Sequence, residues 1–143
     1  MRKTDIEKHV CGESQFIDDI NVPEGTLYAA AFDSKIAHGK ILNINVDEVK
    51  LISGVRAILT SKDIPGINQV GGIIPDETLF AEDEVHFVGE PIGIVVADSY
   101  YIARKAAAKI NIEYEKLPAV SDPREAFEKG KLIMPPRIFS FGN

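Results

Sequence analysis

The sequence predicts one α+β domain spanning residues 1–143, with about six strands in a mixed sheet and roughly two to four helices. Two observations favour this class. Short apolar or alternating runs, which are typical of strands, recur along the chain, whereas the clearest three- and four-residue apolar spacing of a helix lies near residue 100. These elements also follow one another irregularly, so strand–strand and strand–helix–strand links both occur, unlike the strict alternation of an α/β protein.

The first third of the chain predicts two strands after an irregular start. Residues 1–26 carry few strand or helix signals, and glycine, proline and aspartate interrupt them, so we expect an irregular segment. Residues 27–32 form a short apolar run, which predicts a buried strand. Residues 37–46 alternate between apolar and polar, which predicts a half-buried strand. The apolar face of that strand would carry Leu42, Ile44 and Val46.

The middle of the chain predicts short elements and then a long loop. Asp47 is suited to cap a short helix, which Gly54 would close. A strand is predicted at residues 55–59, followed by one helical turn at residues 61–63. Residues 65–84 contain glycines, a proline and several acids, which indicates a loop.

The clearest helix follows two further strands, at residues 85–88 and 92–97. The second strand is almost entirely apolar, so we expect both of its faces to be covered. Pro91 belongs at its start or at a bend, because proline has no backbone donor. Asp98 or Ser99 would cap the helix. Its inward positions, spaced three and four apart, are Ile102, Ala103, Ala106, Ala107 and Ile110.

The last part of the chain predicts a strand at residues 110–114 and a short final helix. Asp122 as cap with Pro123 at the first helical position is typical of a helix start, and Gly130 would end that helix. Residues 131–143 form an apolar tail that we expect to lead to a further domain. The apolar residues of the tail are Ile133, Met134, Ile138, Phe139 and Phe141.

Composition excludes several classes of function. The net charge is -6 and lysine and arginine are scattered singly, which argues against a nucleic-acid partner. Cys11 is the only cysteine of the 143 residues, so no internal disulfide can form, and a reducing compartment fits this. The first residues are charged where a signal peptide is apolar, and no apolar run approaches the ~20 residues of a membrane span. We therefore expect a cytoplasmic protein without a membrane partner.

Four side chains have metal-binding chemistry, but none is predicted to be a ligand. His9 and Cys11 lack the accompanying CxxC or HxxxH spacing of a metal site, so a flexible segment is the simpler interpretation. His38 lies near a strand start and is interpreted as a surface or edge residue. His86 follows the acidic run 82–84, which lacks the alternating oxygen ligands and central glycine of a calcium loop and is interpreted as solvated.

The remaining candidates for chemistry have simpler explanations. Residues 71–72 and Gly89 are glycine-rich but do not form GxGxxG or a phosphate-binding loop, so they are predicted to be turns. No serine lies in a GxSxG setting, and Ser99 is explained as a helix cap. Lys105 and Lys109 are interpreted as a solvated helix face rather than an anion site. No catalytic, cofactor-binding or metal-binding residue is therefore predicted.

Several segments in the same order resemble the amino-terminal α/β-hammerhead domain of the molybdenum-binding large subunit of xanthine dehydrogenases and aldehyde oxidases. The resemblance covers roughly residues 8–128. Each segment is a weak match alone, and the ordered set is specific. One segment is Val88–Gly89–Glu90–Pro91 running into the apolar residues 92–97, although the family often has glutamine where Glu90 stands. Cys11 stands where threonine or serine is common. The other matching segments are 9–19, 27–30, 37–41, 65–66, 79–81, 112–115 and 117–120.

The resemblance implies a domain of an oxidoreductase that hydroxylates heterocycles or aldehydes with water as the oxygen source. The whole enzyme would use molybdopterin, two [2Fe-2S] clusters and FAD. In this family the molybdopterin loops and the glutamate base lie in later domains, so none of these roles passes to a residue of this chain. The implied partners are the downstream molybdopterin-binding domains of the same subunit and the iron–sulfur and FAD domains or subunits. The fragment alone is expected to be inactive and without a cofactor.

Two other functions stay open. A stand-alone binding module of the barrel-sandwich type would carry biotin or lipoate on a lysine in a hairpin turn. Biotin carriers flank that lysine with methionine, whereas methionine occurs here only at positions 1 and 134. The other alternative is a small ligand-binding protein or an independent small enzyme.

Overall fold

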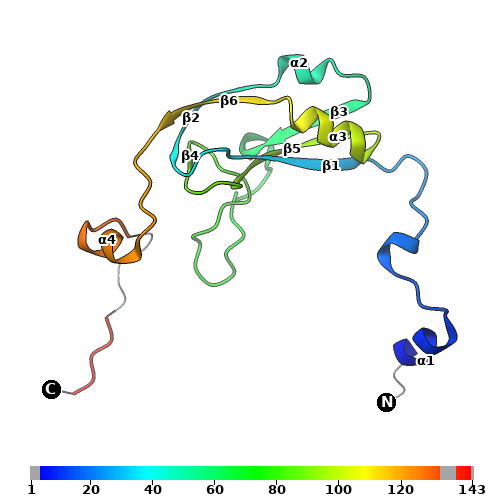
Figure 1. The fold of residues 1–143 in the computed structure, drawn as a ribbon, viewed down its shortest axis with the longest axis horizontal. Helices are drawn as coiled ribbons and strands as arrows, with labels where there is room; N and C mark the ends of the chain where they lie inside the picture. Colours follow the sequence, from blue (N-terminus) through cyan, green and yellow to red (C-terminus); the bar gives the residue numbers. More distant parts are fainter. Residues whose placement is uncertain (1–3, 133–137, 143) are drawn as a thin grey trace.

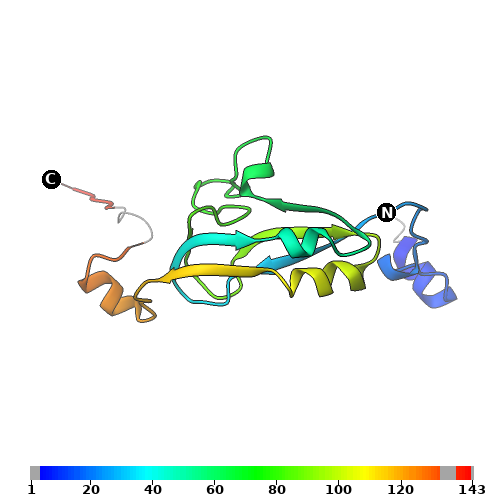
Figure 2. The ribbon, with the colours of Figure 1, turned by 90° about the horizontal axis from the view of Figure 1, so that it is seen from above.

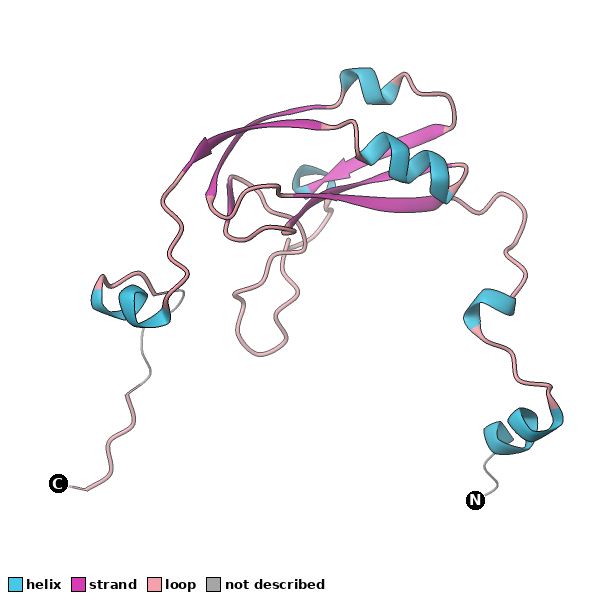
Figure 3. Ribbon diagram, viewed as in Figure 1, coloured by secondary structure: helices cyan, strands magenta, loops and turns pink. Residues whose placement is uncertain are grey.

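The computed structural model describes residues 4–132 and 138–142, and the six strands within them form two antiparallel three-stranded sheets (Figures 1 and 3). In the first sheet β5 (Pro91–Ala97) lies between β1 (Tyr28–Asp33) and β3 (Val55–Thr60). In the second, β2 (Gly39–Asn45) lies between β4 (Glu84–Val85) and β6 (Asn111–Lys116).

The α+β class and the six strands are confirmed, but the predicted single mixed sheet is wrong. Every strand pair in the described residues is antiparallel, and no two strands that follow each other in the chain are paired. Every connection between consecutive strands in the described residues crosses from one sheet to the other. Apolar patterns identify strands but carry no information about which strands pair.

The core lies between the two sheets and the helix beside them. Figures 1 and 2 show β2 and β6 over the same face of the β1–β5–β3 sheet that also carries α3 (Tyr100–Ala107). The largest fully buried apolar side chains are those of Ile92, Val49, Val85 and Val95. Partly buried residues from the second sheet, including Ile44 and Ile112, pack against this cluster.

α3 has the start and the buried face that the sequence predicted. The side chain of Ser99 accepts a hydrogen bond from the backbone N–H of Ile102 at 3.2 Å, which satisfies one of the free donors of the first turn. Ala103, Ala106 and Ala107 are buried against the first sheet. Their small side chains let the helix axis lie close to β1 and β5.

β5 is covered on one face only, so the expectation that both its faces are buried was wrong. Pro91 begins the strand as predicted, and Ile92 and Val95 are fully buried. Ile94 and Val96, however, are only half-buried. They belong to the outer face of the sheet, opposite β2 and β6, over which no described helix or strand packs (Figure 1).

A β-bulge in β2 breaks the alternation that the sequence predicted. The register against β6 shifts between Ile41 and Asn43, so Leu42 has no partner residue and its side chain is 63 % exposed. Ile41 and Ile44 turn toward the core instead. An extra residue in one strand of an antiparallel pair changes which side chains share a face, and this one moved Leu42 out of the predicted set.

Two short elements differ from their predicted bounds. α2 (Asp47–Lys50) is capped by the backbone of Val46 without a side-chain bond, so Asp47 is the first helical residue rather than the cap. β4 ends at Val85, whereas the prediction extended it to residue 88. The chain turns there because Gly89 adopts a φ of 90°, a left-handed conformation that glycine tolerates at no steric cost. The helical turn at Ser61–Asp63 (η2) is confirmed.

The beginning of the chain contains a helix, so the expectation of an irregular segment was wrong for part of residues 1–26. Thr4–Cys11 form α1, and Ile17–Asp19 form a short 3-10 helix, η1. α1 ends in a Schellman motif: Glu13 N–H donates to Lys8 O at 2.8 Å and Gly12 N–H to His9 O at 3.3 Å, with Gly12 at a φ of 71°. The glycine that suggested an interruption is the cap of a helix.

Beyond β6 the chain leaves the sheets, and α4 lies on the side of the first sheet that faces away from β2 and β6 (Figure 1). α4 (Pro123–Glu128) begins as predicted, with the Asp122 carboxylate accepting from Arg124 N–H and Glu125 N–H. Ile133, Met134, Pro135 and Pro136 of the predicted tail lie outside the described residues. The described tail residues Ile138, Phe139 and Phe141 are strongly exposed. No helix in the described part of the chain is long and apolar enough to cross a membrane.

Candidate functional site

The ring of His38 joins segments of the chain that are far apart in sequence. It directly precedes β2, as the prediction of an edge position implied, but both of its ring nitrogens have partners. Nε2 lies 2.6 Å from the Glu84 carboxylate in β4, and Nδ1 lies 2.8 Å from the backbone carbonyl of Pro118, beyond β6. One ring therefore joins three segments that are 46 and 80 residues apart in sequence.

The pair of His38 and Glu84 stabilises its charged form. The carbonyl of Pro118 and then the Glu84 carboxylate raise the pKa of His38 above 6.5, and burial opposes this. The hydrogen bond from His38 lowers the pKa of Glu84 below 4.5. A carbonyl and a carboxylate are both acceptors, so an imidazolium that donates from both nitrogens satisfies them together.

His86 and Glu90 extend this cluster toward the core. The His86 ring stacks on that of His38, with ring centroids 6.2 Å apart and an angle of 25° between the planes. Glu90 is only 7 % exposed, and its carboxylate accepts a hydrogen bond from the backbone N–H of His86. Ser34, which is fully buried, holds the same turn by exchanging backbone hydrogen bonds with Glu90 O and Gly89 N. In the acidic run that precedes His86, Glu82 and Asp83 are exposed, as the solvated interpretation predicted, whereas Glu84 belongs to β4 and contacts His38.

The four side chains of this cluster do not form a metal centre. Among the described residues, no group of three or more histidine, cysteine, aspartate or glutamate side chains is placed to hold a metal ion. The ring of His9 is 2.7 Å from the Ser14 hydroxyl, and Cys11 is exposed at the end of α1. The absence of metal ligands stays a prediction for the whole chain.

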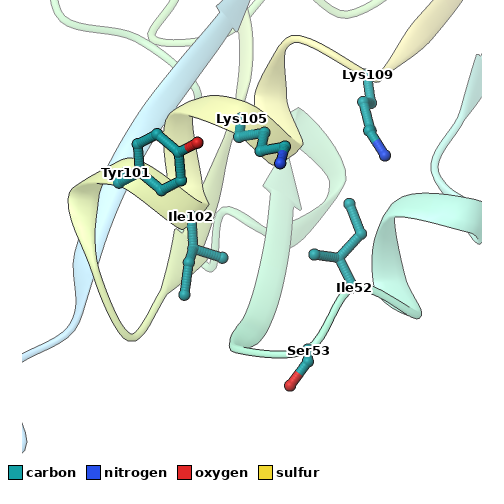
Figure 4. A pocket seen from close by; sticks show the side chains of 6 residues that line it. All are labelled: Ile52, Ser53, Tyr101, Ile102, Lys105 and Lys109. Carbon is teal, nitrogen blue, oxygen red and sulfur yellow. The ribbon is translucent and has the colours of Figure 1, made fainter.

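A small cleft lies beside α3, and it contains both lysines that the sequence singled out. Figure 4 shows the side chains that line it, which come from α3, the turn after it and the link between α2 and β3. Its volume is about 260 Å³, and Lys105 Nζ lies 5.8 Å from the centroid of the Tyr101 ring. The lining residues are Ile52, Ser53, Tyr101, Ile102, Lys105 and Lys109.

The other candidates have structural positions. Gly89 lies in a turn, as predicted, and Gly93 in β5 allows the ring of Phe32 to approach the backbone closely. Tyr114 in β6 has a buried hydroxyl without a close hydrogen-bond partner. Burial raises the pKa of Tyr114, an effect that the nearby Ser34 hydroxyl partly opposes, so this phenol keeps its proton at neutral pH and is no candidate base.

The sequence interpretation missed the cluster around His38 as a unit. Each member was weighed alone or with its neighbours in sequence, and neither Glu84 nor Pro118 lies near His38 in the chain. Many proteins have a histidine just before a strand, and many have a carboxylate at the end of a loop. Neither pattern alone indicates that His38 and Glu84 are in contact.

Comparison with known proteins identifies the domain. Residues 11–118 match the family model described as "Aldehyde oxidase and xanthine dehydrogenase, a/b hammerhead domain". The chain is 47% identical to xanthine dehydrogenase 1 of Arabidopsis thaliana over 117 residues. This alignment covers 82% of this chain and 9% of that protein. It is 41% identical over 128 residues to the xanthine dehydrogenase/oxidase of Gallus gallus, covering 90% of this chain and 9% of that protein.

Solved structures agree with the sequence matches. The aldehyde oxidoreductase of Desulfovibrio gigas superposes with a TM-score of 0.76 at 31% identity, covering 83% of this chain and 14% of that one. Quinoline 2-oxidoreductase of Pseudomonas putida 86 gives a TM-score of 0.71 at 34% identity, covering 90% and 17%. The chain thus spans about a tenth of the length of the curated xanthine dehydrogenases it matches. It belongs to the a/b hammerhead domain family of aldehyde oxidases and xanthine dehydrogenases.

Proposed function

We propose that this chain is a non-catalytic packing domain of a molybdenum-dependent hydroxylase of the xanthine dehydrogenase type. The whole enzyme would hydroxylate a heterocycle or an aldehyde with water as the oxygen source. Its partners would be the molybdopterin-binding domains of the same subunit and the iron–sulfur and FAD domains or subunits. The observation that carries the proposal is an apolar outer sheet face without a partner, in a domain about a tenth as long as its relatives.

The outer face of the first sheet supplies the packing surface. Residues directly opposite one another in neighbouring antiparallel strands share a face. Ala29 pairs with Val96, and Ala31 and Leu59 both pair with Ile94, so these five residues form one apolar surface. The two alanines are exposed, Leu59 is 36% exposed, and Ile94 and Val96 are half-buried.

The long loop between η2 and β4 extends the same surface. Figure 1 shows it on the side of the first sheet opposite β2 and β6. Ile67 is 87% exposed and Ile73 is 96% exposed, although both are apolar. Exposed apolar side chains gathered on one side of a domain are typical of a site that packs against another protein surface.

The residues present do not fit the cofactors of the proposed enzyme. Each [2Fe-2S] cluster takes about four cysteine ligands, or two with two histidines, and this chain has one cysteine. The cleft beside α3 has a volume of about 260 Å³, below the roughly 300–1,000 Å³ typical of cofactor sites. The proposal therefore assigns molybdopterin, iron–sulfur and flavin binding to other parts of the enzyme. It also includes a cytoplasmic location, because an exposed free thiol such as that of Cys11 suits a reducing compartment.

A binding experiment tests the packing role. The 143-residue chain is added to the molybdenum-binding chain of a relative from which the matching segment has been deleted, and the dissociation constant is measured. Replacing both Ile67 and Ile73 by serine should weaken binding at least ten-fold, because each buried isoleucine contributes about 1.5–3 kcal/mol. Leu51→Ser is the matched control: Leu51 is 85% exposed but lies at the α2 end of the molecule.

Two results would contradict the proposal. Equal loss of binding in the Leu51 variant and the double isoleucine variant would show that the loop is not the packing surface. Stoichiometric molybdenum on the purified chain, or turnover of a purine or aldehyde by it alone, would show that the domain itself is catalytic.

A further inference from the structure

We propose that His38 is a proton-operated clamp that fixes the segment leaving β6 to the body of the domain. The inference concerns this chain alone and does not depend on the proposed enzyme. It rests on the geometry of one imidazole ring, whose two nitrogens contact acceptors on two different segments, β4 and residues 117–120.

The bond to Pro118 requires a proton on Nδ1. A backbone carbonyl can only accept, and Nδ1 lies 2.8 Å from it, so this nitrogen is the donor. Nε2 faces the Glu84 carboxylate at 2.6 Å, which is an acceptor when ionised. A neutral ring has one N–H and can hold only one of the two partners, whereas the imidazolium holds both.

A second hydrogen bond within the described residues also holds the segment at this point, and it does not depend on the ring proton. Leu117 N–H donates to His38 O at 3.1 Å, a backbone bond that survives any change in the ring. A charged carboxylate accepts a stronger hydrogen bond than a neutral carbonyl, so the neutral ring keeps its remaining N–H on Nε2, facing Glu84. Loss of the other ring proton should therefore release the chain from Pro118 onward while Leu117 stays paired. α4 begins at Pro123, only a few residues beyond that point.

Charged and titratable groups from several segments surround His38 and affect its protonation. Glu84 in β4 favours the imidazolium, and Lys131, in the segment that follows α4, disfavours it. His86 stacks on the ring, and its own neighbour is Glu90. Lys40 in β2 acts on Glu84 and lies 3.9 Å from Glu115 in β6, so its charge is shared between two carboxylates.

The clamp is closed over a limited range of pH. It needs His38 protonated, so it opens as the pH rises through the raised pKa of His38, above the ordinary 6.5. It also needs Glu84 ionised, so it weakens as the pH falls through the lowered pKa of Glu84, below the ordinary 4.5. The intermediate range, from about pH 4.5 to 6.5, is where both conditions hold.

Nuclear magnetic resonance on the full 143-residue chain tests this directly. The titration of the His38 ring is followed together with the backbone amides of Ala119 and Val120. Both amides should follow the His38 curve with the same midpoint, above 6.5, and backbone order from 119 to 128 should fall once His38 has lost its proton.

Three variants separate the clamp from a general pH effect. In His38→Gln the amides of Ala119 and Val120 should no longer titrate. In Glu84→Gln the midpoint of His38 should move down toward 6.5. His9→Gln, which removes an exposed histidine on α1, is the control and should leave every curve unchanged.

The proposal is overturned if the two amides are independent of pH in the unaltered chain, or if they titrate equally in His38→Gln. Should His38→Gln fail to fold by circular dichroism, Glu84→Gln decides, because an unchanged His38 midpoint in that variant removes Glu84 from the clamp.

Discussion

Gly93 is a position where one added methyl group should disturb the centre of the first sheet. A Cβ atom there would overlap the backbone carbonyl oxygen of Leu59 and lie 2.5 Å from the Phe32 ring carbon Cζ. The strand β3 backbone and the buried Phe32 ring cannot both move aside, because β5 pairs with β1 and β3 at this point. Gly93→Ala should therefore force a shift in the centre of the first sheet.

The size of the effect follows from two opposing contributions. Overpacking a filled site lowers the free energy of unfolding by about 1–3 kcal/mol. Replacing glycine by alanine also reduces the conformational entropy of the unfolded chain, which raises the free energy of unfolding by about 0.4–1 kcal/mol. The free energy of unfolding should fall by about 1–2 kcal/mol, which corresponds to about 3–6 °C in Tm for a domain of this size. Urea unfolding followed by circular dichroism measures it.

Gly66→Ala is the matched control for this prediction. Its Cβ would meet nothing within 4 Å and its φ is not positive, so the variant should be as stable as the unaltered chain or slightly more stable. If Gly93→Ala were as stable as Gly66→Ala, the close approach of Phe32 and Leu59 to Gly93 could not be a constraint on the fold.

Four further predictions follow from the core, the caps and the histidine cluster. Val95→Ala should lower the free energy of unfolding by about 2–3 kcal/mol in urea, because a fully buried side chain leaves a cavity; a loss under about 0.5 kcal/mol would contradict this. Ser99→Ala should cost about 1 kcal/mol by the same measurement, with Ser99→Asp as the variant expected to restore stability. Asp122→Ala should remove the helical Cα chemical shifts of α4 yet leave the Tm of the sheets unchanged; an equal loss of both would show that α4 is part of the core. His38 contributes stability that is present below pH 6.5 and lost as the pH rises through its raised pKa. Glu84 contributes stability that is present above pH 4.5 and lost as the pH falls through its lowered pKa. His38→Gln should therefore flatten the dependence of the free energy of unfolding in urea on pH, and parallel pH profiles for the two proteins would refute the assignment.

Elements with a local chemical signal could be predicted from sequence. Ser99 caps α3 because its hydroxyl reaches a backbone donor three residues away, and Asp122 does the same for α4. Pro91 starts β5 because it lacks a backbone donor. In each case the deciding contact lies within a few residues, so composition and spacing contain it.

Features that depend on distant contacts could not be predicted. The bulge that exposes Leu42 is set by the register of β2 against β6. His38 meets Glu84 and Pro118 only after both sheets have formed. α1 was missed for a different reason: Gly12 was interpreted as an interruption, although a left-handed glycine is also how many helices end.

The order of the strands affects how the domain can fold while it is being synthesised on the ribosome. Among the described strands neither sheet contains a hairpin of consecutive strands: β1 pairs with β5, and β2 pairs with β4 and β6, all of which are made later. Such distant pairing is slow, because a large loop must close before any contact rewards it. Until β5 has left the exit tunnel, β1 and β3 have no partner strand, and a chaperone that binds apolar segments has the most time to bind them.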